Sequence, residues 1–384
     1  MQNKADILQL IQQGENKSVE FKNQKVKADS LAKEIIAFAN SDGGTILIGV
    51  NDDGTIDGID DQKTNYEEWI ANISRNNIIP SIESKYFGVE IENKKVGVIM
   101  ISKGQDKPYQ TTSGKYYIRI GSTNRIASQQ ELLRLYQASG AFHYDLNPVP
   151  NTGLGDLNFA KLDNYFHSYQ INFTNESETQ KITLLKNTDI LTKNEEVTIA
   201  GLLIFGINPS RHLFQNGISF AYFSGQSINE DLIDKQNIDG NLDYQIDIAS
   251  KIIKKYIAVP STIIGTKRVN QKFIYPDKVT RELVTNAVVH RNYAISGSRI
   301  RIFLFEDRLE VISPGRLPNT VEIEKLRFGV SFAVNPVIVK FMENMHYIDQ
   351  LGRGLPMVYH EATTNGKQVE FYEIGEEFKV TLEI

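Results

Sequence analysis

Residues 31–52 read LAKEIIAFANSDGGTILIGVND, and this stretch decides the fold of the N-terminal part of the chain. Apolar side chains recur at helical spacing over residues 31–40, which predicts a helix with one buried face. Two glycines end that helix, and the apolar run at 45–50 predicts a buried strand. The sequence Asn-Asp-Asp-Gly that follows the strand is typical of a turn.

Further predicted helices and strands flank this stretch and make up the rest of the chain. On either side of it, the patterns predict helices at 6–13 and 128–139, and strands at 18–22, 96–101 and 116–120. Residues 145–156, DLNPVPNTGLGD, are rich in Pro, Gly and Asn and predict a linker. Beyond the linker, the patterns predict helices at 158–170, 243–257, 277–290 and 334–345, and strands at 200–206, 218–223, 299–305 and 308–313.

These elements predict an α+β fold in three parts. We expect an N-terminal α/β domain over residues 1–140, a mixed α/β connector over 150–270, and a C-terminal α/β sandwich over 271–384. A chain of 384 residues has room for two or three hydrophobic cores. The connector carries no motif, and we expect it to mediate formation of a homodimer or a higher homo-oligomer.

The composition excludes several classes of protein. Cys is absent, so disulfides, thiolate metal sites and a Cys nucleophile are excluded. No stretch is long and apolar enough for a signal peptide or a membrane span, which predicts a cytoplasmic protein without membrane contact. The net charge is −5, and residues 1–130 contain 16 Lys+Arg and 17 Asp+Glu residues. Any nucleic-acid site must therefore be a local patch or use a metal to screen phosphates.

Three carboxylates near strand ends form the first candidate site. Glu15 follows the first expected helix, Glu20 lies in the strand at 18–22, and Asp52 follows the strand at 45–50. Carboxylate oxygens are the ligands that Mg²⁺ and Mn²⁺ prefer, and such a metal can activate water for phosphodiester cleavage. Lys22 lies on the same strand face as Glu20 and can contact the scissile phosphate. The alternative is that these are ordinary surface carboxylates beside turns.

Several separated blocks in this part of the chain resemble the Schlafen family, whose bacterial module is known as AlbA_2 or divergent AAA-4. The blocks are ENKSVEFK at 15–22, AFANSDGGTILIGVND at 37–52, KPY at 107–109 and YIRIGSTN at 117–124. In Schlafen nucleases the site is two glutamates and one aspartate, which the resemblance places at Glu15, Glu20 and Asp52. Many bacterial members are described only as DNA-binding, so the resemblance implies nucleic-acid binding and, in its nuclease branch, catalysis.

Basic and aromatic residues gather near the end of the same region. Four basic residues are the candidates for nucleic-acid contact: Lys107, Lys115, Arg119 and Arg125. Together with neighbouring tyrosines they can form a groove that follows phosphates and stacks bases. The alternative is that the aromatic residues belong to the sheet core and the charges are solvated.

A second constellation lies on the helix expected at 277–290. Glu282 and Asn286 are four residues apart and therefore share one helix face. A carboxylate that orients water and an amide oxygen that ligates Mg²⁺ can then point into one pocket. The alternative is an ordinary helix with one polar face.

Four blocks in order resemble the GHKL ATPase fold in its HATPase_c_4 form: Glu282–Ala287, Ser313–Pro318, Asn335-Pro336 and Gly352–Val358. The resemblance implies that Asn286 holds the Mg²⁺ of bound ATP and that Glu282 is the general base. Gly352 and Gly354 would approach the phosphates through backbone N–H groups. Ser313, followed two residues later by Gly315, stands where such proteins place an adenine-reading Asp.

Two functions follow from these patterns. The first, whose RNA substrate the Schlafen resemblance implies, is a divalent-metal-dependent endonuclease that acts on structured, tRNA-like RNA. It would be regulated by nucleotide at the C-terminal domain, with weak ATPase activity as an option. The second is an ATP-sensing, DNA-binding transcriptional regulator without nuclease activity. A P-loop motor is disfavoured, because the chain contains no GxxxxGK[ST] sequence.

Overall fold

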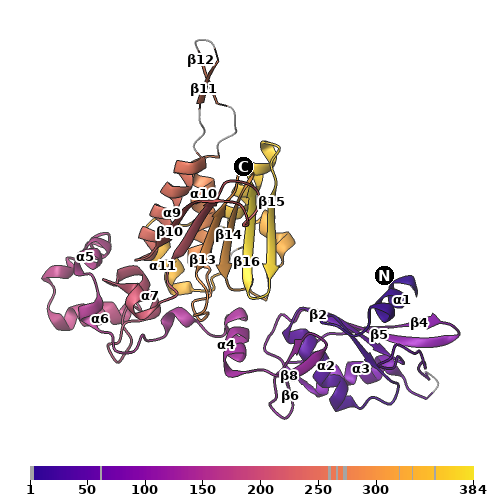
Figure 1. The fold of residues 1–384 in the computed structure, drawn as a ribbon. Coiled ribbons are helices and arrows are strands. Elements are labelled where there is room, and N and C mark those ends of the chain that lie inside the picture. Colours follow the sequence, from indigo (N-terminus) through magenta and orange to yellow (C-terminus); the bar gives the residue numbers. More distant parts are fainter. Residues whose placement is uncertain are drawn as a thin grey trace. The chain divides into compact units, whose positions relative to one another are not determined.

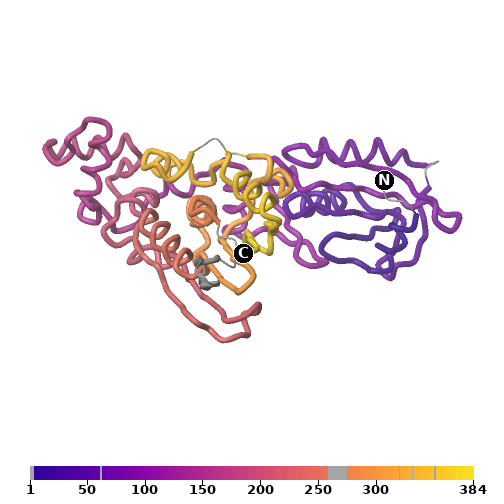
Figure 2. The backbone as a smooth tube through the Cα atoms, turned by 90° about the horizontal axis from the view of Figure 1, so that it is seen from above, coloured from indigo at the N-terminus to yellow at the C-terminus, as the bar shows by residue number. Residues whose placement is uncertain are grey.

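In a computed structural model, the chain forms two compact units, Met1–Phe142 and His143–Ile384. The two units can be followed by colour, indigo to purple and magenta to yellow, in Figures 1 and 2. Each unit combines helices with a mixed sheet, which confirms the predicted α+β fold. The structure describes residues 4–60, 63–257, 261–264, 267–270, 275–319, 321–330, 332–349 and 352–384.

A four-stranded sheet in the order β1-β2-β5-β4 organises unit 1. Strand β1 (Val19–Lys22) pairs in parallel with β2 (Gly43–Ile48), and β5 (Lys94–Ser102) pairs antiparallel with both β2 and β4 (Lys85–Ile91). The parallel pair places Glu20, on the edge strand β1, beside Ile46 of β2. The remaining strands form two small ribbons: β3 (Ile78–Ile79) with β6 (Gln110–Thr111), and β7 (Tyr117–Ile120) with β8 (Thr123–Ile126).

Helices bury both faces of this sheet. The helix α2 (Ala28–Asn40) packs with α3 (Tyr66–Asn76) over one hydrophobic cluster, and α1 (Lys4–Gln13) contributes Ile7 to a second cluster. Gly44 permits the close approach of α2, because a Cβ atom there would overlap the Phe38 ring. A last helix, α4 (Gln129–Ala138), begins with a capping box made by Ser128 and Glu131.

Unit 2 is built on a six-stranded sheet in the order β10-β9-β13-β14-β16-β15. Only the β9–β13 pair is parallel, and the other neighbours are antiparallel. The expected hairpin at 299–313 is confirmed as β13 (Ile300–Leu304) and β14 (Arg308–Pro314). The other strands of this unit are β9 (Ile218–Phe223), β10 (Leu232–Ile238), β15 (Val369–Ile374), β16 (Glu377–Glu383) and, in a separate hairpin, β11 (Ser261–Ile264) and β12 (Lys267–Asn270).

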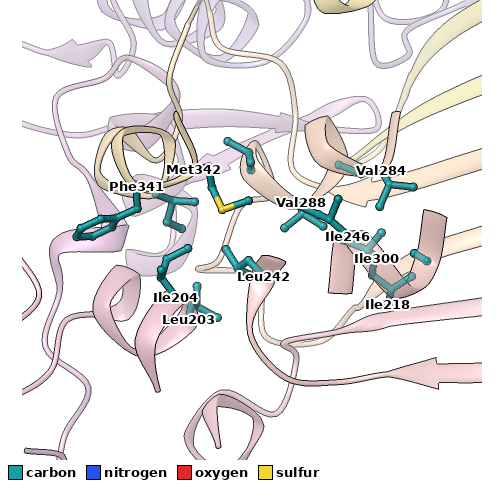
Figure 3. Packing of buried hydrophobic residues seen from close by; sticks show 14 of the residues in the cluster. Leu203, Ile204, Ile218, Leu242, Ile246, Val284, Val288, Ile300, Phe341 and Met342 are labelled. Carbon is teal, nitrogen blue, oxygen red and sulfur yellow. The ribbon is translucent and has the colours of Figure 1, made fainter. Parts of the chain in front are cut away.

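The helices of unit 2 bury one large hydrophobic core against this sheet. In Figure 3, Leu203 and Ile204 lie near Phe341 and Met342, while Val288 of α10 lies near Ile246 of α9. Burial of each large apolar side chain contributes about 1.5–3 kcal/mol. The helices are α5 (Phe159–His167), α6 (Glu178–Asn187), α7 (Ile199–Phe205), α8 (Pro209–His212), α9 (Leu242–Ile257), α10 (Asp277–Val289), α11 (Pro336–Asn344) and α12 (Gly354–Thr364).

The prediction of a strand at 200–206 is wrong, because these residues form helix α7. All seven residues of α7 are buried, and a short apolar run shows no periodicity that separates a strand from a buried helix. The Thr198 hydroxyl accepts a hydrogen bond from Gly201 N at 2.9 Å and caps the helix. Tertiary burial therefore decided this element.

The expected division into a connector at 150–270 and a domain at 271–384 also differs from the structure. Both stretches belong to the same compact unit. The physical reason is that β9 and β10, which lie in the expected connector, extend the sheet of the expected C-terminal domain through the β9–β13 pair. Within the described residues, no helix combines the length and apolar character that a membrane crossing requires.

Candidate functional site

Glu20 lies on β1 and is nearly buried, with 6% of its surface exposed. Its Oε2 accepts a hydrogen bond from Arg119 Nη1 at 2.7 Å, and its Oε1 pairs with the Lys22 ammonium group. Both carboxylate oxygens are therefore occupied by cationic side chains. A buried charge requires such partners, because burial alone would strongly disfavour its ionised form.

Arg119 lies on β7 and is the main partner of Glu20. Its side chain is 1% exposed and also donates to the Asn16 and Val19 carbonyl oxygens and to Asn124 Oδ1. Its guanidinium lies 4.5 Å from the centre of the Phe38 ring. These contacts fill the donor capacity of an arginine fork. Arg119 therefore joins β7 to β1 and α2, and does not lie on a surface as the nucleic-acid interpretation expected.

The other two predicted metal ligands have different surroundings from Glu20. Glu15 Oε1 accepts a hydrogen bond from Phe21 N at 2.9 Å, and Asp52 is exposed in the turn after β2. Across the part of the chain that the structure describes, no three His, Cys, Asp or Glu side chains are grouped so that they could hold a metal ion. In this arrangement the set Glu15, Glu20 and Asp52 does not fit a shared Mg²⁺ or Mn²⁺.

Glu34 on α2 is a member of this cluster that the sequence patterns missed. The Lys22 ammonium lies 3.4 Å from Glu34 Oε1 and between it and Glu20. Burial raises the pKa of Glu34, the Glu20 charge raises it further, and Lys22 and Arg119 act against both. Burial also acts to lower the pKa of Lys22, but the Glu20 hydrogen bond and the surrounding carboxylates raise it overall. Helical spacing could have indicated that Glu34 faces the interior, because it is three residues from the buried Leu31 and shares its helix face.

The remaining basic candidates occupy three different environments. Lys107 is buried, and its Nζ donates to the Ser41 carbonyl oxygen at 2.6 Å. Arg125 forms two hydrogen bonds to Glu131, at 2.7 and 2.9 Å, and this contact lowers the Glu131 pKa to about 2. Lys115 is exposed. Of the four predicted contacts to nucleic acid, the structure therefore places Lys107 and Arg119 in the interior.

The C-terminal candidates, by contrast, meet at one cavity of about 750 Å³ in unit 2. The cavity lies among α10, the end of β14, the start of α12 and the segment between β14 and α11. Apolar side chains from that segment line part of it, including Leu326, Val330 and Phe332. All six residues predicted from the E-x-x-x-N and glycine blocks line the cavity: Glu282, Asn286, Ser313, Gly315, Gly352 and Gly354.

Glu282 and Asn286 are in direct contact on α10, as their spacing predicts. Asn286 Nδ2 donates to Glu282 Oε1 at 2.6 Å and to the Glu282 carbonyl oxygen at 2.9 Å. Because the amide nitrogen is used in this way, the amide oxygen is the atom suited to Mg²⁺. Burial raises the pKa of Glu282, the Asn286 hydrogen bond lowers it, and the Asp349 charge raises it.

Gly354 explains how the Glu282 carboxylate reaches the start of α12. A Cβ atom on Gly354 would overlap that carboxylate, so this position admits Glu282 only because it lacks a side chain. Gly354 is the first residue of α12, and a helix N-terminus favours a negative group through its unpaired N–H groups and its dipole. The same location is suited to a phosphate.

Ser313 lies near the end of β14 and contacts α10. The residue is buried, and its hydroxyl donates to the Ala287 carbonyl oxygen at 2.7 Å. Because its hydrogen is used in this bond, the Ser313 oxygen can act toward a ligand only as an acceptor. Two further cavity residues, Asp349 and Arg353, were not predicted from the motifs, although Arg353 lies between the two predicted glycines.

Two family models match the chain. Residues 15–128, within unit 1, match the model described as "Schlafen, AlbA_2". Residues 297–382, within unit 2, match HATPase_c_4, described as "Putative ATP-dependent DNA helicase recG C-terminal". The helix α10 with Glu282 and Asn286 precedes the second matched region. No curated protein matches the chain.

Two solved structures are similar to parts of the fold. The crystal structure of the DIP2311 protein from Corynebacterium diphtheriae shares 21% identity at a TM-score of 0.47, covering 96% of this chain and 64% of that one. The chain thus spans 64% of that protein's length. The N-terminal domain of a putative ATP-dependent DNA helicase RecG-related protein from Nitrosomonas europaea shares 22% identity at a TM-score of 0.26, covering 33% of this chain and 95% of that one. The chain joins a Schlafen/AlbA_2 domain to a C-terminal HATPase_c_4 domain.

Proposed function

We propose that this protein binds nucleic acid through unit 1 and an adenine nucleotide with Mg²⁺ in the cavity of unit 2, and that the nucleotide regulates the first activity. The observation that carries the proposal is the convergence of three separate sequence blocks on one cavity. A volume of about 750 Å³ lies within the range of roughly 300–1,000 Å³ that is usual for small-molecule sites.

Each part of the cavity has chemistry that suits a nucleotide. Apolar walls such as Val330 and Phe332 can pack against a base, and the Ser313 oxygen can accept a hydrogen bond from an exocyclic amine. Backbone N–H groups at the start of α12 can bind phosphate. The Asn286 oxygen can ligate a Mg²⁺ ion that arrives with the nucleotide. Glu282, whose pKa is raised, can accept a proton from water if hydrolysis occurs.

The test of nucleotide binding is titration calorimetry of the full chain with MgATP, MgADP and MgGTP. We expect Asn286→Ala to weaken MgATP binding by about 10-fold or more, as loss of a charge-assisted contact predicts. Lys278→Ala is the matched control, because Lys278 lies on the same helix, pairs with Glu361 and does not line the cavity. The proposal is wrong if wild-type protein binds none of the three nucleotides, or if both variants bind MgATP as wild type does.

For unit 1 we propose nucleic-acid binding as the primary activity. The family match supports it, and the pairing of Glu20 with Arg119 and Lys22 favours a structural role for Glu20. The measurement is binding of labelled tRNA, single-stranded RNA and duplex DNA at several salt concentrations, with and without MgATP. We expect affinity to fall with salt, because phosphate contacts release counterions, and to change with MgATP.

A nuclease is the second candidate, and the cluster of Glu20, Lys22 and Glu34 is the observation that favours it. Lys22 is 21% exposed there and can contact a phosphate, while two carboxylates lie beside it. Incubation of the same nucleic acids with and without Mn²⁺ tests this function, including the expected preference for RNA. Cleavage that is lost in Glu20→Gln but kept in the surface variant Glu67→Gln would support it. Absence of cleavage under all conditions would leave binding as the function of unit 1.

A further inference from the structure

Arg353 lines the cavity but is not among the residues proposed to contact the nucleotide. It occupies the N-cap position of α12, and its side chain is 70% exposed. Its Nη2 lies 2.8 Å from Asp349 Oδ2, and the Asp349 side chain is 51% exposed. Both residues line the cavity, and Arg353 directly precedes Gly354, which lies against the Glu282 carboxylate. The residue pair is therefore at the phosphate end of the proposed nucleotide site.

The charges at this end do not yet suit a polyphosphate. Glu282 and Asp349 bring two carboxylates close enough for the charge of Asp349 to act on Glu282. A nucleoside triphosphate adds several more negative charges, and the N-terminus of α12 offers only a partial positive charge. Arg353 is the cationic side chain at this helix start, and its present partner is a carboxylate.

We propose that Arg353 binds the polyphosphate of the nucleotide by exchanging Asp349 for phosphate oxygens, so that Asp349 is an internal competitor for the same guanidinium. This inference rests on the proposed nucleotide-binding function and names one residue that reads the phosphates. An exposed ion pair contributes little stability, so the exchange is inexpensive. A guanidinium also matches phosphate geometry with two parallel hydrogen bonds, which an ammonium group does not.

A competing role of Asp349 and a supporting role of Asp349 can be distinguished by removing its charge. If Asp349 only stabilised Arg353 in its binding position, its removal would weaken nucleotide binding. If Asp349 competes with phosphate, its removal releases Arg353 and strengthens binding of phosphorylated ligands. The two roles therefore predict changes of opposite sign.

The experiment is calorimetric titration of the full chain with adenosine, AMP, ADP and ATP in the presence of Mg²⁺. The variants are Arg353→Gln, Arg353→Lys and Asp349→Asn, with Lys278→Ala as the control. We expect Arg353→Gln to weaken ATP binding by about 10-fold, as loss of a charge-assisted hydrogen bond predicts, and to leave adenosine binding unchanged. The affinity of Arg353→Lys for ATP should lie between those of Arg353→Gln and wild type, and Asp349→Asn should bind ATP more tightly than wild type.

The outcomes separate this inference from the proposed function. If wild-type protein binds neither adenosine nor ATP, the proposed function fails. If wild type binds ATP more tightly than adenosine and Arg353→Gln keeps that preference, the proposed function stands and the inference is overturned. If Arg353→Gln loses adenosine binding as well, Asp349→Asn decides, because tighter ATP binding supports the inference and unchanged or weaker binding overturns it.

Discussion

The charged cluster of unit 1, around Glu20, and the cavity of unit 2 look alike in the sequence. Each is marked there by a few polar residues at motif spacing. In unit 1 the structure pairs them with one another, since Glu20 is held by Arg119 and Lys22. In unit 2 the six predicted residues surround an open cavity. A motif of charged residues thus identifies a place in the fold, and the partners of those residues decide whether the place is a buried support or a ligand site.

The largest effect that can test this comparison is expected for Arg119→Ala. The substitution leaves the Glu20 carboxylate buried without its main partner, which should destabilise unit 1 by about 3–5 kcal/mol. Urea unfolding followed by circular dichroism measures this change. Lys115→Ala is the control from the same set of predicted residues, and it should leave the unfolding midpoint unchanged. An equally mild effect of both variants would mean that Arg119 is not a structural residue.

Asp145 provides the second test, because unit 2 also contains a buried charge with a structural role. Its Oδ2 accepts hydrogen bonds from Val337 N at 2.8 Å and Ile338 N at 3.1 Å, and so caps α11 from 192 residues away in sequence. We expect Asp145→Ala to destabilise unit 2 by about 1–2 kcal/mol, the usual size of a lost cap. Thermal unfolding measures it. Asp156→Ala, a less buried residue of the same segment, is the comparison, and an equal loss there would contradict the capping role.

The third test uses the pH dependence of stability. Since the pKa of Glu282 is raised in the folded protein, the folded state binds this proton more tightly than the unfolded chain does. Ionisation of Glu282 therefore lowers stability as pH rises above the ordinary carboxyl pKa of 4.5. We expect Glu282→Gln to melt at a higher temperature than wild type at pH 7, with the difference shrinking toward pH 4.5.

Glu324→Gln is the matched control for this measurement, because Glu324 is an exposed carboxylate of the same unit. Its melting temperature should follow wild type at every pH. A constant difference between Glu282→Gln and wild type across the pH range would show that ionisation of Glu282 is not the cause.

The smallest expected effect concerns Lys115, the predicted nucleic-acid contact that is exposed. If it contacts a phosphate, Lys115→Ala should weaken binding of all nucleic acids alike and reduce the slope of log affinity against log salt by about one unit. Filter binding at four salt concentrations measures this slope. Arg125→Ala provides the comparison, because the Arg125 guanidinium is already paired with Glu131. An unchanged slope in Lys115→Ala would remove Lys115 from the interface.

The sequence by itself determined most of the secondary structure and six of the residues that line the cavity. Helices and strands such as α2, β2 and the β13–β14 hairpin follow from local periodicity and turn residues, which the chain carries within a few positions. The cavity residues Glu282 and Asn286 were predictable because helical spacing alone places them on one face. Blocks of glycine marked the loops that approach them.

Only the tertiary structure decided which charges are paired and which remain accessible. Arg119 and Glu20 are 99 residues apart, and no local pattern shows that they meet. No local pattern shows that Asp145 meets the first residues of α11 either. Nor does one show that the apolar run at 199–205 is a helix, which its burial decided. The physical reason is that local spacing sets which side of an element a residue faces. Its partner is set by the packing of elements that are distant in sequence.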